Sequence, residues 1–144
     1  MNDLETRIAR IEAKDEIREL TARYCHAVVD GDAETIVSLF AADGSFRTHT
    51  FAPQGHAELL EFYGNGVGGK THKPFVQNHV IEFEDEDHAS GRCSVEIRLL
   101  QDGRPFTQAG HYHDRYVHTD GRWKFAERNY MRYHNVPWGE GWSK

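Results

Sequence analysis

The hydrophobic positions follow a helical period in the first half of the chain and a period of two in the second. Leu4, Ile8 and Ile11 recur at helical spacing and predict a first helix. Residues 14–29 continue the rhythm in a second helix, which ends at an Asp-Gly-Asp turn over 30–32. Two shorter helices are predicted over residues 36–40 and 56–63.

From residue 75 onward apolar and polar side chains alternate, which is typical of strands with one buried face. Strands are predicted over residues 75–83, 89–99, 106–118 and 123–133. Asp-Gly pairs at 102–103 and 120–121 mark the hairpin turns between the last three. Helices followed by antiparallel strands predict a single α+β domain over 1–144, in which helices wrap one face of a curved sheet around a pocket.

Composition and charge narrow the choice of partners. The 144 residues carry a formal net charge of -6 without a basic stripe, so no nucleic-acid partner is expected. No apolar run is long enough for a membrane helix, and the charged N-terminus does not resemble a secretion signal. Cys25 and Cys93 share no metal or redox motif, which predicts two reduced, buried thiols in a cytoplasmic protein.

Asp30 is a candidate for proton transfer because it directly follows the apolar run 27–29. Apolar surroundings destabilise a carboxylate, raise its pKa and prepare it to act as a general base or acid. The competing interpretation is an ordinary helix-end aspartate in a turn with Gly31. His72 or His79, near the start of the first long strand, would supply the second half of a proton-transfer pair.

Further polar candidates lie on the predicted strands. His111 and His113 are two residues apart and share one face, where three interpretations stay open: a solvent-facing polar surface, two metal ligands, or hydrogen bonds to a substrate. A metal ion would need another ligand, for which His72 or His79 is available. Asn78 and His79 are also candidates for substrate binding, but they point to opposite faces unless a β-bulge lies between them.

Three stretches carry a family resemblance: IRELTARYCHAVVDGDAETIVSLFAADGSF, QNHVIEF and GHYHDRYVHTDGRWKFAERNY. Together with the order of the elements they cover most of the chain. The chain resembles the SnoaL-like branch of the nuclear-transport-factor-2-like superfamily, which includes scytalone dehydratase, bile acid 7α-dehydratase, the lindane dehydrochlorinase and the ketosteroid isomerases. The resemblance implies a cone-shaped, cystatin-like fold, and the superfamily also holds non-catalytic members.

Residue by residue, the resemblance gives Asp30 the place of the catalytic aspartate and Tyr24 that of a polar pocket residue. The catalytic histidine of these relatives stands four residues before the asparagine matched here by Asn78. That position is Pro74 in this chain, and His72, two residues earlier, is the candidate replacement.

The sequence leaves two functions open. The first is a dehydratase-like lyase or an isomerase that needs no cofactor or metal and acts through Asp30 and His72. Its substrate would be a small, hydrophobic, cyclic or aromatic oxygenated compound, with Tyr24, His111 or His113 binding the oxygen. The second is a non-catalytic binding module or accessory subunit for an apolar ligand, which the missing histidine favours.

The sequence also carries expectations about self-association, the C-terminal tail and the glycine-rich segment. The resemblance implies a homodimer or higher homo-oligomer in which cones pair through their sheets. The tail NVPWGEGWSK carries Trp138 and Trp142 among glycines and a proline, which predicts an irregular segment over the pocket mouth or against a second subunit. The glycine-rich segment 64–69 lacks the ending of a nucleotide-binding loop and is expected at the rim of the pocket.

Overall fold

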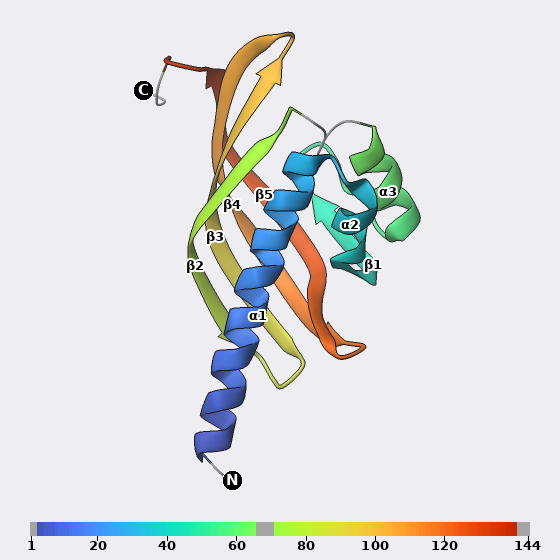
Figure 1. Cartoon of the computed structure of the whole chain (residues 1–144), viewed down its shortest axis with the longest axis vertical. Coiled ribbons are helices and arrows are strands. Elements are labelled where there is room, and N and C mark those ends of the chain that lie inside the picture. Colours follow the sequence, from blue (N-terminus) through green and yellow to red (C-terminus); the bar gives the residue numbers. More distant parts are fainter. Residues whose placement is uncertain (1–2, 66–70, 141–144) are drawn as a thin grey trace.

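The computed structural model of the chain describes residues 3–65 and 71–140. Its elements are α1 (Asp3–Asp30), α2 (Ala33–Ser38), β1 (Phe40–Arg47), α3 (His56–Gly64), β2 (Lys73–Phe83), β3 (His88–Gln101), β4 (Arg104–Thr119) and β5 (Arg122–Pro137) (Figure 1). The strand order is β1-β5-β4-β3-β2, and β1 runs parallel to β5 while the other neighbours are antiparallel. The predicted α+β class is confirmed.

Two elements differ from the prediction. Residues 3–30 form one continuous helix, because this stretch contains no glycine or proline that would interrupt it. Residues 40–47 form β1, where a helix was predicted to end at residue 40 and no strand was predicted. The pairing of β1 with β5 shifts register between Phe40 and Ser45, so the strand lacks the regular alternation that sequence analysis depends on.

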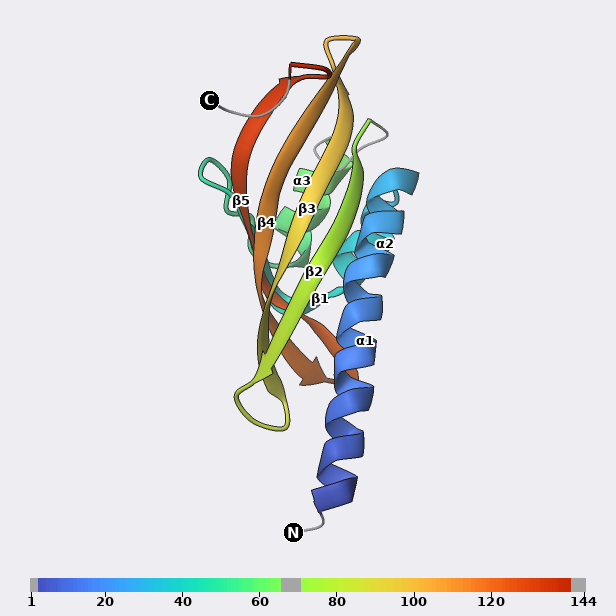
Figure 2. The ribbon, with the colours of Figure 1, turned by 90° about the vertical axis from the view of Figure 1, so that its left-hand side faces the viewer.

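All three helices lie on one face of the curved sheet, and the core lies between the two layers (Figure 2). Ile17, Leu20 and Val28 on α1 are each at most 5% exposed and contribute to this core. Ile8 and Ile11 are exposed instead, because the first turns of α1 extend past the end of the sheet (Figure 1). Within the described ranges, no helix is both long and apolar enough to cross a bilayer.

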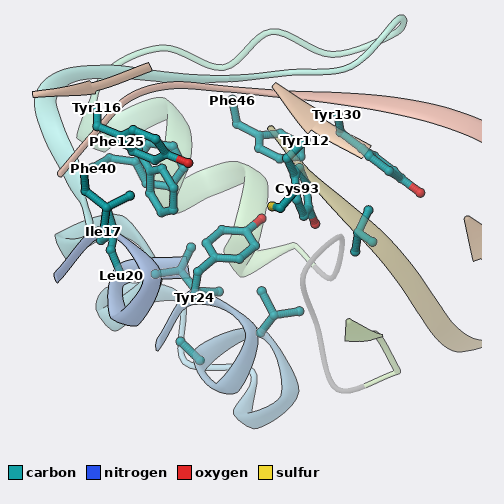
Figure 3. Packing of buried hydrophobic residues seen from close by; sticks show 14 of the residues in the cluster. Ile17, Leu20, Tyr24, Phe40, Phe46, Cys93, Tyr112, Tyr116, Phe125 and Tyr130 are labelled. Carbon is teal, nitrogen blue, oxygen red and sulfur yellow. The ribbon is translucent and has the colours of Figure 1, made fainter. Parts of the chain in front are cut away.

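The core is dominated by aromatic rings (Figure 3). Tyr24 of α1 contacts the rings of Phe40, Tyr63, Tyr112 and Phe125 edge-on, with centroids 5.7–6.4 Å apart. Edge-to-face contacts of this kind stabilise aromatic pairs beyond the effect of area burial. The helix α1 is therefore fixed against the sheet at the level of Tyr24.

The two cysteines and the tail can be placed in part. Cys25 and Cys93 are buried free thiols, as predicted.

Trp138 stacks on the guanidinium of Arg98, 5.1 Å from the ring centroid, and Arg98 belongs to the sheet face that the helices leave uncovered. Trp138 therefore does not cover the pocket described below, and Trp142 and residues 66–69 of the glycine-rich segment lie outside the described residues.

Candidate functional site

A cavity of about 140 Å³ lies between helices α1 and α3 and the inner face of the sheet. Its walls are mainly apolar, formed by side chains such as Val28, Phe46, Phe62, Ile97 and Tyr112. An apolar cavity of ~150 Å³ is large enough to bind benzene. The space therefore suits one six-membered ring with small substituents.

One polar feature of this cavity is a buried pair of tyrosine hydroxyls. The hydroxyl oxygens of Tyr24 and Tyr63 lie 2.7 Å apart, and both side chains are buried. Burial raises the pKa of Tyr24 to about 12 against the opposing charge of Arg128, and burial raises the pKa of Tyr63 as well. Both phenols are therefore protonated at neutral pH. One hydroxyl hydrogen forms the mutual bond, which leaves the other for a ligand oxygen.

A second polar pair and a cation lie along the sheet side of the cavity. Tyr130 donates a hydrogen bond through its hydroxyl to Gln108 Oε1 at 2.9 Å, and both residues line the cavity. Arg132 follows two residues later on β5, also lines the cavity and is exposed to solvent. Positive charge therefore lies at the mouth and neutral donors lie inside.

His72 lies in the cavity lining, just before β2 begins. Burial lowers its pKa, so the imidazole is neutral at pH 7 and can accept a proton. Its Nδ1 lies 3.4 Å from the hydroxyl of Thr71. Pro74, two residues further on, also lines the cavity, so the chain here brings both an imidazole and the proline to the same wall.

Asp30 lies outside this cavity. It is exposed at the last residue of α1 and is not part of the cavity lining, whereas Val28 is. Side chains two positions apart on an α-helix are separated by about 200° around its axis, so Val28 and Asp30 face nearly opposite ways. The expectation of apolar surroundings for Asp30 was wrong, and the structure does not bring Asp30 and His72 into one site.

Three other candidates lie on the outer face of the sheet, away from the cavity. His111 Nδ1 is 2.6 Å from the hydroxyl of Tyr133, and the ring centroids of His111 and His113 are 6.1 Å apart. Asn78 donates a hydrogen bond through Nδ2 to Ser94 Oγ at 3.3 Å. None of the candidates on this face lines the cavity, which corrects their expected contact with a substrate bound there. In the described part of the chain, no three His, Cys, Asp or Glu side chains are grouped to hold a metal ion.

His79 faces inward but belongs to the core rather than to the cavity lining. A register shift between Gln77 and Val80, with Asn78 at φ 57°, forms the bulge that sequence analysis left open. Asn78 and His79 nevertheless face opposite sides of the sheet. The His79 Nε2 lies 2.9 Å from the hydroxyl of Tyr116, which itself donates to Asp114, so Nε2 carries the hydrogen.

Several lining residues were missed by the sequence analysis, notably Tyr63, Gln108, Tyr130 and Arg132. Gln108 could have been recognised from the sequence. It lies an even number of residues from the inward-facing Tyr112 on the same strand, so both side chains point to the same face of the sheet. A polar residue at an inward position of a strand is a candidate to line a pocket. Tyr63 gave no such signal, since an aromatic residue on a short helix is ordinarily part of the core.

The SnoaL-like domain family matches residues 9–129 of this sequence. The chain belongs to the SnoaL-like family. No curated protein sequence matches it. This SnoaL-like chain is similar in structure to a hexachlorocyclohexane dehydrochlorinase, LinA type 3 of Novosphingobium barchaimii, with a TM-score of 0.82, 19% identity and coverage of 95% and 97% of the two chains.

Two further structures, both from Novosphingobium aromaticivorans, agree with this fold. One is named for scytalone dehydratase and has a TM-score of 0.78 and 20% identity, covering 94% of this chain and 98% of that one. The other is an NTF2-like protein with a cystatin-like fold, with a TM-score of 0.74, 22% identity and coverage of 98% and 92%. The predicted superfamily and cystatin-like fold of this SnoaL-like protein are therefore confirmed, and at these identities the likeness concerns the fold alone.

Proposed function

We propose that this SnoaL-like protein is a lyase or isomerase that moves a proton on a small cyclic or aromatic oxygenated compound without a cofactor. One observation carries the proposal: a ring-sized cavity holds a neutral imidazole, His72, and the hydroxyl pair of Tyr24 and Tyr63 in the same lining. An imidazole can remove a proton, and a buried phenol can donate a hydrogen bond to an oxygen that gains negative charge.

The roles follow from the chemistry of each group. His72 would take a proton from the carbon next to a carbonyl, and the C–H electron pair would form an enolate whose oxygen accepts a hydrogen bond from the tyrosine pair. Loss of a β-hydroxyl as water, with a proton supplied by the imidazolium, completes an elimination. Return of the proton to another carbon completes an isomerisation. Apolar walls strengthen the hydrogen bonds to the enolate oxygen by keeping water away.

Deuterium exchange at the α-carbon of cyclohexanone in heavy water tests this proposal before the true substrate is known. We expect wild-type protein to catalyse exchange and His72→Gln to lose it by about 100-fold or more, the usual contribution of a general base. His26→Gln, which alters an exposed histidine of α1, is the matched control. Exchange that persists unchanged in His72→Gln would exclude His72 as the base.

A second candidate function is a binding module that holds an apolar ligand without converting it. Two observations favour it: Pro74 occupies the cavity wall where the family resemblance places a histidine, and no described lining residue is a carboxylate. The module predicts saturable binding of cyclohexanone with no exchange in either wild-type or His72→Gln protein. Recovery of intact, unexchanged ligand after prolonged incubation would support it over the enzyme.

We further propose that the chain self-associates. Large apolar side chains remain exposed on two surfaces, Ile8 and Ile11 on α1 and Met131 and Tyr133 on the outer face of the sheet. Burial of such side chains is favourable, which supports a homo-oligomer. Sedimentation velocity at micromolar concentration checks this, and a monomer at all concentrations would contradict it.

A further inference from the structure

Arg132 gives the cavity a permanent positive charge. Its side chain is exposed at the mouth, on β5, two residues from Tyr130. Burial raises the pKa of the Tyr130 hydroxyl, and the nearby charge of Arg132 opposes that rise, so the guanidinium field reaches the cavity wall. Because a guanidinium keeps its charge at any physiological pH, this field is constant.

Within residues 3–65 and 71–140, no carboxylate forms an ion pair with Arg132. Two other arginines of the same sheet illustrate the contrast: Arg47 lies 2.6 Å from Glu127, and Arg128 lies 3.0 Å from Asp114. The guanidinium of Arg132 is therefore available to an anion that enters the cavity.

The described lining of the cavity has no negative group to oppose such an anion. The chain carries 23 acidic residues, yet none of the described lining residues is Asp or Glu. On a protein with a net charge of -6, an unpaired cation beside an apolar cavity with no acid in its described lining attracts an anion to that cavity.

We propose that the ligand of this cavity is a small aromatic or alicyclic carboxylate, with its ring among Phe46, Phe62 and Tyr112 and its carboxylate on Arg132. The volume of about 140 Å³ admits one such ring, and a planar guanidinium matches a carboxylate through two parallel hydrogen bonds. The Tyr24–Tyr63 pair then lies deeper than the carboxylate, where it binds an oxygen substituent on the ring. The inference deepens the proposed function by naming the substrate class of the same cavity.

Affinities for benzoate and benzamide, measured by titration calorimetry at low ionic strength, test this inference. The two molecules share ring and shape, and only benzoate is charged. We expect benzoate to bind about fivefold tighter or more. A gain in affinity of this size lies between the gain typical of an exposed ion pair and that of a hydrogen bond to a charged group. Added salt will weaken benzoate binding and leave benzamide binding unchanged.

Arg132→Gln is expected to remove the preference for benzoate while the affinity for benzamide stays the same, which also shows that the variant is folded. Arg92→Gln, an exposed arginine on the outer face of the sheet, is the matched control and should keep the preference. Equal affinities in wild-type protein, a preference that survives Arg132→Gln, or no binding of either compound overturns the inference. Since the readout is binding, cyclohexanone exchange without a benzoate preference rejects the carboxylate and leaves the proton-transfer function standing.

Discussion

Arg128 and Asp114 form an ion pair in the core, with Arg128 Nε 3.0 Å from Asp114 Oδ1 and both side chains fully buried. The guanidinium carbon of Arg128 also lies 3.6 Å from the ring centroid of Tyr112 and 4.5 Å from that of Tyr24. Both tyrosines line the cavity, so the ion pair supports the cavity wall from behind. The aromatic rings and the carboxylate offset part of the cost of removing the arginine from water, while Arg128 Nη1 has no hydrogen-bond partner among the described residues.

We predict that Arg128→Met and Asp114→Asn each lower the free energy of unfolding by about 3–5 kcal/mol, because each leaves a buried group without its charged partner. Urea unfolding of the purified variants measures this. Arg92→Met, at an exposed site, is expected to change stability by less than about 0.5 kcal/mol. A loss below 1 kcal/mol in both core variants would mean that the ion pair contributes little.

The hydrogen bond between Tyr24 and Tyr63 predicts non-additive mutations. Tyr24→Phe or Tyr63→Phe alone should cost about 1–2 kcal/mol, because the remaining hydroxyl is buried without a partner. The double variant should cost less than the sum, since it removes both polar groups at once. A double-mutant cycle by urea unfolding gives the coupling energy, and a coupling of zero would contradict the bond.

His79 predicts a pH dependence of stability. Burial lowers its pKa from 6.5 to about 4, with the carboxylate of Asp114 acting against that shift and Arg128 adding to it. The unfolded chain therefore binds a proton below pH 6.5 that the folded chain does not bind until about pH 4. Stability is lost as the pH falls through this window, by about 1–2 kcal/mol once partial exposure of the side chain is allowed for.

His79→Gln should remove this part of the pH dependence, because glutamine does not titrate. The check is a comparison of unfolding free energies at pH 7 and pH 5 for wild-type protein and the variant. We expect the wild type to lose more stability than His79→Gln between these two values. Equal losses would show that His79 has the same pKa in both states.

The position of Asp30 predicts a substitution without effect. Because its side chain is exposed and outside the cavity lining, Asp30→Asn should change α-proton exchange by less than about twofold, as expected of a surface substitution. The measurement is the exchange assay in which His72→Gln is expected to be inactive. Loss of exchange in Asp30→Asn would instead assign the base to Asp30, as the family resemblance implies.

Local sequence determined the elements that depend on near neighbours. Residues 75–133 alternate in polarity, and their Asp-Gly turns adopt positive φ at Asp102 and Asp120. These patterns defined the strands and hairpins because hairpin pairing is a short-range event. The strand β1 was missed for the opposite reason: its partner, β5, lies some eighty residues away, and pairing with it decides the conformation.

The sequence by itself determined the fold class, the buried cysteines and two cavity residues, Tyr24 and His72. It did not determine which way the Asp30 side chain points. Side chains two residues apart on a helix point in nearly opposite directions, and the packing of α1 decides which of them faces the cavity. Only the tertiary structure brought Tyr63 to Tyr24 and Arg132 to the cavity mouth. These contacts join residues that lie far apart in the sequence, and packing between helices and sheet positions them.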